Sequence, residues 1–230
     1  MPSPQAGRDA NAEDDSIDVR ADAGAESANA ADGAAPAARK RPKPGERRVQ
    51  ILQTLAAMLE EPGADRITTA ALAAKLSVSE AALYRHFASK AQMFEGLIEF
   101  IEQSIFTLIN QITERDADPA LQARRIVFML LQFGEKNPGM ARVMVGDALV
   151  FENERLSARM NQFFDKIESQ LRQSLRAAAE QAGSQTPTVD ANGRASALTA
   201  LAVGRLQRFT RSGFKRSPTE QIEMALGLLT

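Results

Sequence analysis

From Gly45 to the C-terminus, apolar residues recur three and four positions apart, which is the spacing of one face of an α-helix. One such stripe runs through Phe94, Leu97, Ile98, Ile101, Ile105, Leu108 and Ile112. No segment shows the two-residue alternation, rich in β-branched residues, that is typical of a strand. We therefore expect an all-α fold.

Proline, glycine and capping residues divide this region into separate expected helices. The first ends at the turn 61–63, and two short helices lie within residues 66–90. Asp118 and Pro119 open a helix that the triplet 137–139 closes, because proline is tolerated at the first helical position and glycine commonly follows a helix end. A long helix is expected from Ser89. Three more are expected at 148–181, 195–211 and 218–229, with a loop at 183–188.

Residues 66–90 have the pattern of two short helices joined by a tight turn. Thr68 or Thr69 can cap the first helix, whose small apolar face would consist of Ala70, Leu72, Ala73 and Leu76. The second helix begins at Ser79 and turns Leu83 and Phe87 inward with Val78, which leaves Ser79, Glu80, Tyr84 and Arg85 outside. This is the geometry of a helix-turn-helix, whose second helix enters the DNA major groove.

Several polar side chains in and near this segment are candidates for contact with DNA. Ser79 and Glu80 can reach base edges, and Ala81 or Ala82 can touch a thymine methyl group. Glu80 can accept a hydrogen bond from cytosine, or it can simply offset the helix macrodipole. The remaining candidates are Arg47, Arg48, Thr68, Thr69, Tyr84, Arg85, His86 and Lys90. In the alternative of an ordinary pair of core helices, Tyr84 and His86 would be half-buried.

Charge is divided unevenly along the chain, which has a net charge of −1. Residues 1–38 hold eight acids and two bases, a net charge of −6, so the remainder carries +5. Basic residues crowd just before and into the first expected helix: Arg39, Lys40, Arg41, Lys43, Arg47 and Arg48. They suit an arm that neutralises phosphates, with a solvated linker as the alternative. We expect residues 1–44, which lack aromatics, to form a disordered acidic tail ending in this arm.

The run LYRHFASK, preceded by SVSEAA, resembles the DNA-binding domain of the TetR family of dimeric bacterial regulators. The resemblance implies a helix-turn-helix domain of three helices at residues 45–92 and a helical dimerisation and partner-binding domain at 93–230. It also implies a homodimer, since reading a palindromic site in double-stranded DNA requires a twofold axis. Leu198, Leu201, Ala202, Leu206 and Phe209, with Gly204 among them, form a face suited to close helix contact, either with a second copy or inside the monomer.

Longer stretches of the sequence resemble one particular group within the TetR family. RITTAALAA, VSEAALYRHFASK, MFEGLIEFIE, FGEKNPGM and FENERLSARMNQFFDKIESQLRQSLR are similar to the nucleoid occlusion factors of the SlmA family, over roughly residues 46–216. That similarity implies a protein that binds specific palindromic sites and, when bound to DNA, antagonises polymerisation of FtsZ, the tubulin-like division protein. It would thereby block septum assembly over the chromosome.

In that family the C-terminal tail of FtsZ lies in a groove between the fourth and fifth helices. The resemblance assigns this groove to Phe100, Leu108, Met129, Gln132, Lys136 and Asn137. Leu108 stands where the family has an arginine and Gln132 where it has a glycine, so an anionic tail would lose a bidentate partner and meet a bulkier floor. Plain core packing is the alternative for Phe100 and Met129.

The residue inventory argues against an enzyme. His86 is the only histidine and cysteine is absent, so a Ser-His or Cys-His nucleophile would need a residue already assigned to the DNA motif. We expect no metal, no cofactor and no small-molecule ligand. The competing function is a ligand-responsive TetR-type transcriptional repressor, whose pocket could be lined by Phe128, Phe133, Phe163 and Phe164. The chain starts without a hydrophobic signal segment, which favours a cytoplasmic, nucleoid-associated protein.

Overall fold

The structure, a computed structural model, describes residues 45–61 and 66–230. The expected tail at 1–44, including the first four residues of its basic arm, lies outside these ranges, as does most of the turn at 61–63. Every regular element in the described residues is a helix, which confirms the all-α fold. None of the described helices is long and apolar enough to cross a bilayer.

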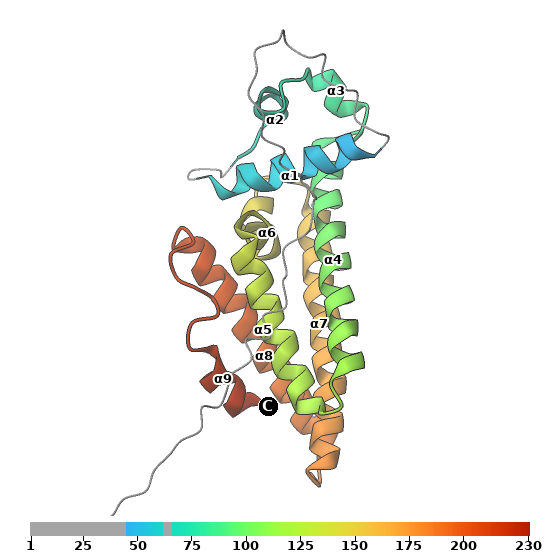
Figure 1. The fold of residues 1–230 in the computed structure, drawn as a ribbon, viewed down its shortest axis with the longest axis vertical. Helices are drawn as coiled ribbons and strands as arrows, with labels where there is room; N and C mark the ends of the chain where they lie inside the picture. The colour runs from blue at the N-terminus through green and yellow to red at the C-terminus, as the bar shows by residue number, and fades with distance from the viewer. Residues whose placement is uncertain (1–44, 62–65) are drawn as a thin grey trace, which may run out of the picture.

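The helices form a small head and a long body (Figure 1). The head consists of α1 (Glu46–Glu60), α2 (Thr69–Lys75) and α3 (Glu80–Tyr84). The long helices of the body are α4 (Lys90–Arg115), α5 (Pro119–Lys136), α7 (Glu154–Gln181) and α8 (Pro187–Arg211). Its short elements are α6 (Pro138–Met144), the 3-10 turn η1 (Asp147–Leu149) and α9 (Ile222–Leu229). In Figure 1, α4 leaves the head and runs down the body beside α7.

Side-chain caps set the starts of four helices where the sequence predicts them. Thr68, Ser79 and Ser89 each accept a hydrogen bond from the backbone N–H three residues ahead, at 3.1, 3.3 and 3.2 Å. Asp118 accepts from the N–H two residues ahead at 2.9 Å, and Pro119 takes the first helical position of α5. Each cap satisfies a backbone donor that has no partner inside its helix.

Three expected helix starts are wrong, those of α7, α8 and α9. The helix expected from residue 148 begins six residues later, because Gly146 adopts φ 83°, residues 147–149 form η1, and Asn153 caps α7. The helix expected from residue 195 begins instead at Pro187. There Asp190 accepts hydrogen bonds from the hydroxyls of two loop residues, Ser184 and Thr186, and these bonds fix the chain just before and in the first turn.

The triplet 137–139 and the last helix also differ from expectation. A helix that was not predicted, α6, follows directly on Asn137, so the triplet separates two helices instead of leading into a loop. The last helix begins at Ile222 and not at residue 218, because Gln221 adopts the left-handed φ of 52°. Ala70, expected on the apolar face of α2, is exposed because it lies on the outer side of that helix's first turn.

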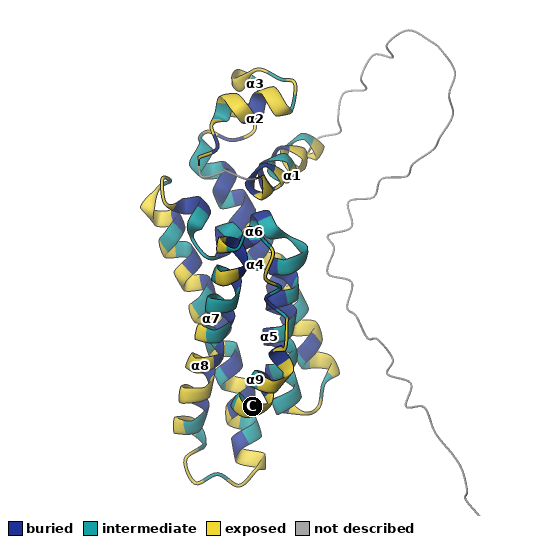
Figure 2. Cartoon of the chain, turned by 90° about the vertical axis from the view of Figure 1, so that its left-hand side faces the viewer, coloured by how far each residue is buried: buried dark blue, intermediate teal, exposed yellow. Residues whose placement is uncertain are grey.

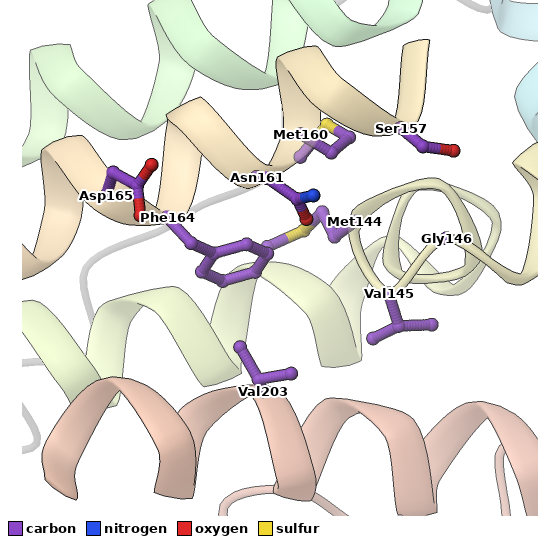
Figure 3. A pocket seen from close by; sticks show the side chains of 9 residues that line it. All are labelled: Met144, Val145, Gly146, Ser157, Met160, Asn161, Phe164, Asp165 and Val203. Atoms are coloured by element: carbon purple, nitrogen blue, oxygen red, sulfur yellow. The ribbon is translucent and has the colours of Figure 1, made fainter. Parts of the chain in front are cut away.

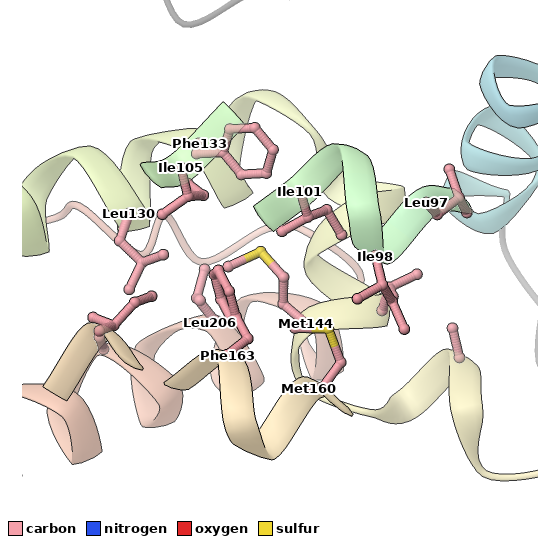
Figure 4. Packing of buried hydrophobic residues seen from close by; sticks show 14 of the residues in the cluster. Leu97, Ile98, Ile101, Ile105, Leu130, Phe133, Met144, Met160, Phe163 and Leu206 are labelled. Carbon is pink, nitrogen blue, oxygen red and sulfur yellow. The ribbon is translucent and has the colours of Figure 1, made fainter. Parts of the chain in front are cut away.

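The hydrophobic core runs along the body between α4, α5, α7 and α8 (Figures 2 and 4). Phe163 of α7 is fully buried, and its ring meets that of Phe106 of α4 edge-on with centroids 5.9 Å apart. Four residues expected on the contact face of α8 are buried in this core: Leu198, Ala202, Leu206 and Phe209. Of the two alternatives for this face, burial inside the monomer is therefore the one found.

Ion pairs fasten α4 to α7 along the outside of this core. Glu95 binds Arg155 at 2.6 Å, and Glu102 binds Arg159 at 2.5 Å. The hydrogen bonds that the Arg159 guanidinium donates to Glu102 raise the pKa of Arg159, which is already charged at every physiological pH. The helix that leaves the head is thus held against the body by charge as well as by apolar packing.

Candidate nucleic-acid interface

The head presents a helix-turn-helix at one end of the molecule (Figure 1). In the turn after α2, Ser77 adopts the left-handed φ of 54°, and the N–H of Val78 donates to the carbonyl of Ala73 at 3.0 Å. The redirected chain then buries Leu83 and Phe87, both at most 1% exposed, beneath α3. The inward residues are those that the sequence predicts, and Val78 is half-buried and packs against the core.

The predicted reading face is exposed. Ser79, Glu80, Arg85 and His86 are all exposed, and 45% of Tyr84 is accessible. Thr68 is exposed as well, whereas Thr69 and Ala82 are half-buried. The alternative of an ordinary core pair does not fit, because a buried role would hide Tyr84 and His86. Their exposure leaves two hydrogen-bonding side chains available at the end of α3.

Two hydrogen bonds order the start of α3. The hydroxyl of Ser79 is the cap, and the hydroxyl of Thr69 donates to Glu80 Oε2 at 2.6 Å. The second bond joins α2 to α3 and gives Glu80 a role that needs no base. Glu80 Oε1 has no hydrogen-bond partner among the described residues, so it is still able to accept a hydrogen bond from a base.

Arg48 connects α1 to the end of the helix-turn-helix. Its Nη1 donates to the carbonyl oxygen of His86 at 2.8 Å, and its guanidinium carbon lies 4.1 Å from the centroid of the Phe87 ring. A guanidinium can stack on an aromatic ring and donate sideways at the same time. Arg47 instead donates to Gln50 on the same helix at 2.7 Å. Arg48 therefore positions the segment, a role that sequence reasoning missed.

Lys90 lies at the start of α4 as expected, but its ammonium group already has an anionic partner. It forms an ion pair with Glu152, in the segment between η1 and α7, and lies 5.6 Å from the centroid of the Phe94 ring. The side chains of Lys90 and Glu152 are 23% and 10% exposed. A phosphate at this position would have to compete with a carboxylate that is 62 residues away in the sequence.

The six residues assigned to the FtsZ tail lie on α4, on α5 and at the junction of α5 with α6. Phe100, Leu108, Gln132 and Lys136 are half-buried. Met129 is 2% exposed and belongs to the core, so the packing alternative holds for it. Asn137 is half-buried, and its side-chain amide donates to the carbonyl of Phe133 at 2.8 Å, which closes the end of α5.

A cavity of about 300 Å³ opens between α6, α7 and α8 (Figure 3). Its walls include Met144, Met160, Phe164 and Val203, with the polar side chains of Asn161 and Asp165 beside them. Of the four phenylalanines expected to line a pocket, Phe164 does so, whereas Phe133 and Phe163 are core residues and Phe128 is half-buried against the core. The described residues contain no cluster of His, Cys, Asp or Glu that could hold a metal ion.

Two domain families match the chain. Residues 51–97 match the bacterial regulatory proteins of the tetR family, and residues 118–230 match the SlmA-like type of the tetracyclin repressor-like C-terminal domain. Among solved structures, the TetR family transcriptional regulator PfmR from Thermus thermophilus superposes with a TM-score of 0.62 at 22% identity, over 79% of this chain and 94% of that one. A TetR family regulator from Agrobacterium tumefaciens has a TM-score of 0.67 at 17% identity, over 82% of this chain and 100% of its own. These likenesses confirm the TetR-like fold.

Closer relatives share half of their residues with this chain. The nucleoid occlusion factor SlmA of Vibrio vulnificus (strain YJ016) is 51% identical over 189 residues, which are 82% of this chain and 96% of the relative. That of Photobacterium profundum is 51% identical over 185 residues, 80% of this chain and 94% of the relative. SlmA and TetR-type regulators are not enzymes. From this identity, and from the helix-turn-helix head on its helical body, the chain belongs to the SlmA family of nucleoid occlusion factors.

Proposed function

We propose that the chain is a homodimeric nucleoid occlusion factor that reads palindromic double-stranded DNA. In the DNA-bound state it would bind the C-terminal tail of FtsZ and block septum assembly over the chromosome, as a cytoplasmic protein on the nucleoid. The observation that carries the proposal is the exposed polar face from Ser79 to His86, at the free end of a head whose large apolar residues Leu83 and Phe87 are turned inward.

On this face we assign the start of α3 to bases and its end to phosphates. Ser79 and Ala82 would lie at base edges in the major groove. Tyr84 and His86 would donate to phosphate oxygens, and Arg48 would hold the carbonyl of His86 in place from α1. Contacts to phosphate position a protein on any duplex, whereas contacts to base edges select the sequence.

A second copy of the chain fits the outer face of α8, opposite the side buried in the core. Gly193, Ala197 and Ala200 are exposed there, and Gly204 is half-buried. A Cβ added at either glycine would meet nothing within 4 Å, so the monomer does not require these glycines for packing. Small residues allow two helix backbones to approach closely. Ala200→Arg should therefore give monomers in sedimentation equilibrium, and a variant that stays dimeric would place the interface elsewhere.

The FtsZ tail would lie along the seam between α4 and α5. Phe100 and Leu108 offer partly exposed apolar groups on one side, and Gln132 lies on the other. Because Leu108 cannot make the charge-assisted bonds of the arginine found in the family, we expect the tail to bind weakly. Leu108→Arg should strengthen binding of a tail peptide by about tenfold, the equivalent of one charge-assisted hydrogen bond. Unchanged affinity would show that the tail does not contact residue 108.

The proposed function as a whole is tested by FtsZ polymer sedimentation in the presence of the purified protein. Genomic fragments that contain palindromic sites are compared with random duplexes of equal length and concentration. Loss of polymer that depends on the specific fragments is the expected result. If the polymer is unaffected although the protein binds the specific fragments, the protein is a transcriptional regulator and not a division inhibitor.

The cavity beside Phe164 favours a second candidate, a ligand-responsive repressor (Figure 3). Its volume of about 300 Å³ is at the lower end of the range for small-molecule sites. A thermal-shift screen with small apolar acids tests it. A compound that raises the melting temperature and releases DNA would support the repressor, and Phe164→Trp should abolish the shift by filling the cavity.

A further inference from the structure

Basic residues gather where α8 ends and the chain turns back on itself. Arg208 and Arg211 occupy the last turn of the helix, and Lys215 and Arg216 follow within five residues. The hydroxyl of Ser212 accepts hydrogen bonds from the N–H groups of Lys215 at 3.1 Å and Arg216 at 2.9 Å. These bonds hold the returning chain against the helix, so the basic residues before and after the turn are brought together.

Three of the arginines at this turn share one recess. A cavity of about 150 Å³ is lined by Arg205, Arg208, Arg216, Ser217 and Glu220. Arg205 Nη1 donates to the backbone carbonyl of Glu220 at 2.8 Å, which sets the direction of its guanidinium. None of the three guanidinium groups forms an ion pair with a carboxylate among the described residues. The recess therefore carries an excess of positive charge that Glu220 alone offsets in part.

The helix dipole does not account for this arrangement. A basic residue in the last turn of a helix is stabilised by the carbonyl groups there, and this explains Arg208. It does not explain Arg216, which lies beyond the helix and is folded back toward two other arginines by the bonds to Ser212. Like charges held this close repel each other, and an anion in the recess would relieve that repulsion.

We propose that this recess binds a small phosphate-bearing anion, at a site separate from the helix-turn-helix. Guanidinium groups match phosphate oxygens with two parallel hydrogen bonds, which an ammonium group does not do. At about 30 Å³ for each water in the liquid, the recess has the volume of roughly five waters. This volume fits one or two phosphate groups, whereas the flat surface of a macromolecule could not enter it. The hydroxyl of Ser217, on the cavity wall, donates to the hydroxyl of Thr219, which itself donates to Glu135, so Ser217 shapes the wall and the guanidinium groups supply the donors to the anion.

Isothermal titration of the full-length protein with inorganic pyrophosphate, at constant ionic strength, tests this site. We expect saturable binding of one pyrophosphate per chain. The double variant Arg208→Gln and Arg216→Gln should weaken binding at least tenfold, since two charge-assisted partners are lost. Arg211→Gln is the control: it removes one positive charge from the end of the same helix but does not line the recess, and it should change affinity less than twofold.

Further titrations separate the sources of the phosphate. Inorganic phosphate and a nucleoside diphosphate, compared with pyrophosphate, show which anion the site prefers, and binding of any of them that the double variant loses supports the site. Three results would overturn the proposal: no saturable binding, equal loss in Arg211→Gln, or binding of random duplex DNA but of no small anion. All three substituted side chains are exposed, and thermal unfolding without anion checks that each variant folds.

Discussion

Head and body approach each other closely at Gly139, where α6 meets α1. An ideal Cβ at this glycine would stand 2.1 Å from the carbonyl oxygen of Ala56 and 3.0 Å from its carbon. Real Cβ atoms essentially never approach within 3.0 Å, so Gly139→Ala requires the two helices to separate by about 0.9 Å. Overpacking of this kind costs about 1–3 kcal/mol, and the better helix propensity of alanine returns up to about 1 kcal/mol. With the gain from alanine taken at about 1 kcal/mol, we expect a net loss of up to about 2 kcal/mol in the free energy of unfolding.

Urea denaturation followed by circular dichroism measures this loss, with Gly227→Ala as the matched control. Gly227 also lies in a helix, α9, but a Cβ there would meet nothing within 4 Å, so alanine should stabilise the protein by about 0.5–1 kcal/mol. The same clash should tilt the head on the body and reduce affinity for palindromic DNA. If Gly139→Ala is as stable as its control and binds DNA unchanged, the close approach of α6 to α1 does not constrain the position of the head.

Three further predictions follow from single side chains. Glu152→Gln should release Lys90 to phosphate, so affinity for random duplexes rises and the slope of log affinity against log salt steepens by about 0.9; an unchanged slope would contradict this. Tyr84→Ala should weaken binding to all sequences alike in gel-shift titrations, whereas Ser79→Ala should alter sequence preference, and equal losses on specific and random DNA for both would refute the assignment. The hydroxyls of Ser184 and Thr186 hold the pKa of Asp190 below its ordinary value of 3.8. The resulting stability is present above that value and lost as the pH falls through the lower folded value, so Asp190→Asn should destabilise at neutral pH and not in strong acid, as thermal unfolding against pH would show.

Local features of the sequence predict much of the architecture. Ser79, Ser89 and Asp118 cap helices where they are expected to, because a cap bonds to a backbone group only two or three residues ahead. The inward and outward residues of α3 follow in the same way from helical periodicity, and Leu83 and Tyr84 lie on the expected sides. The head and its exposed polar face could therefore be predicted before any tertiary structure was known.

Helix boundaries fail where short polar segments compete with a helix. The stretch around residue 148 has helical composition, yet the left-handed Gly146 and the cap at Asn153 delay α7 until Glu154. The start of α8 at Pro187 depends on hydrogen bonds from a loop to Asp190. In both places the free-energy difference between one more helical turn and a loop is small, so the choice depends on a few contacts that apolar periodicity does not reveal.

The all-α class, the helix-turn-helix and its exposed side chains follow from the sequence alone, since they depend on neighbours within about one helical turn. Long-range packing pairs Glu152 with Lys90, brings Arg48 to the carbonyl of His86 and buries Met129 in the core. It also turned one face of α8 inward and left the other free. Pairs of this kind join residues tens of positions apart. Which of them form depends on how whole helices pack together, and packing is a property of the complete fold.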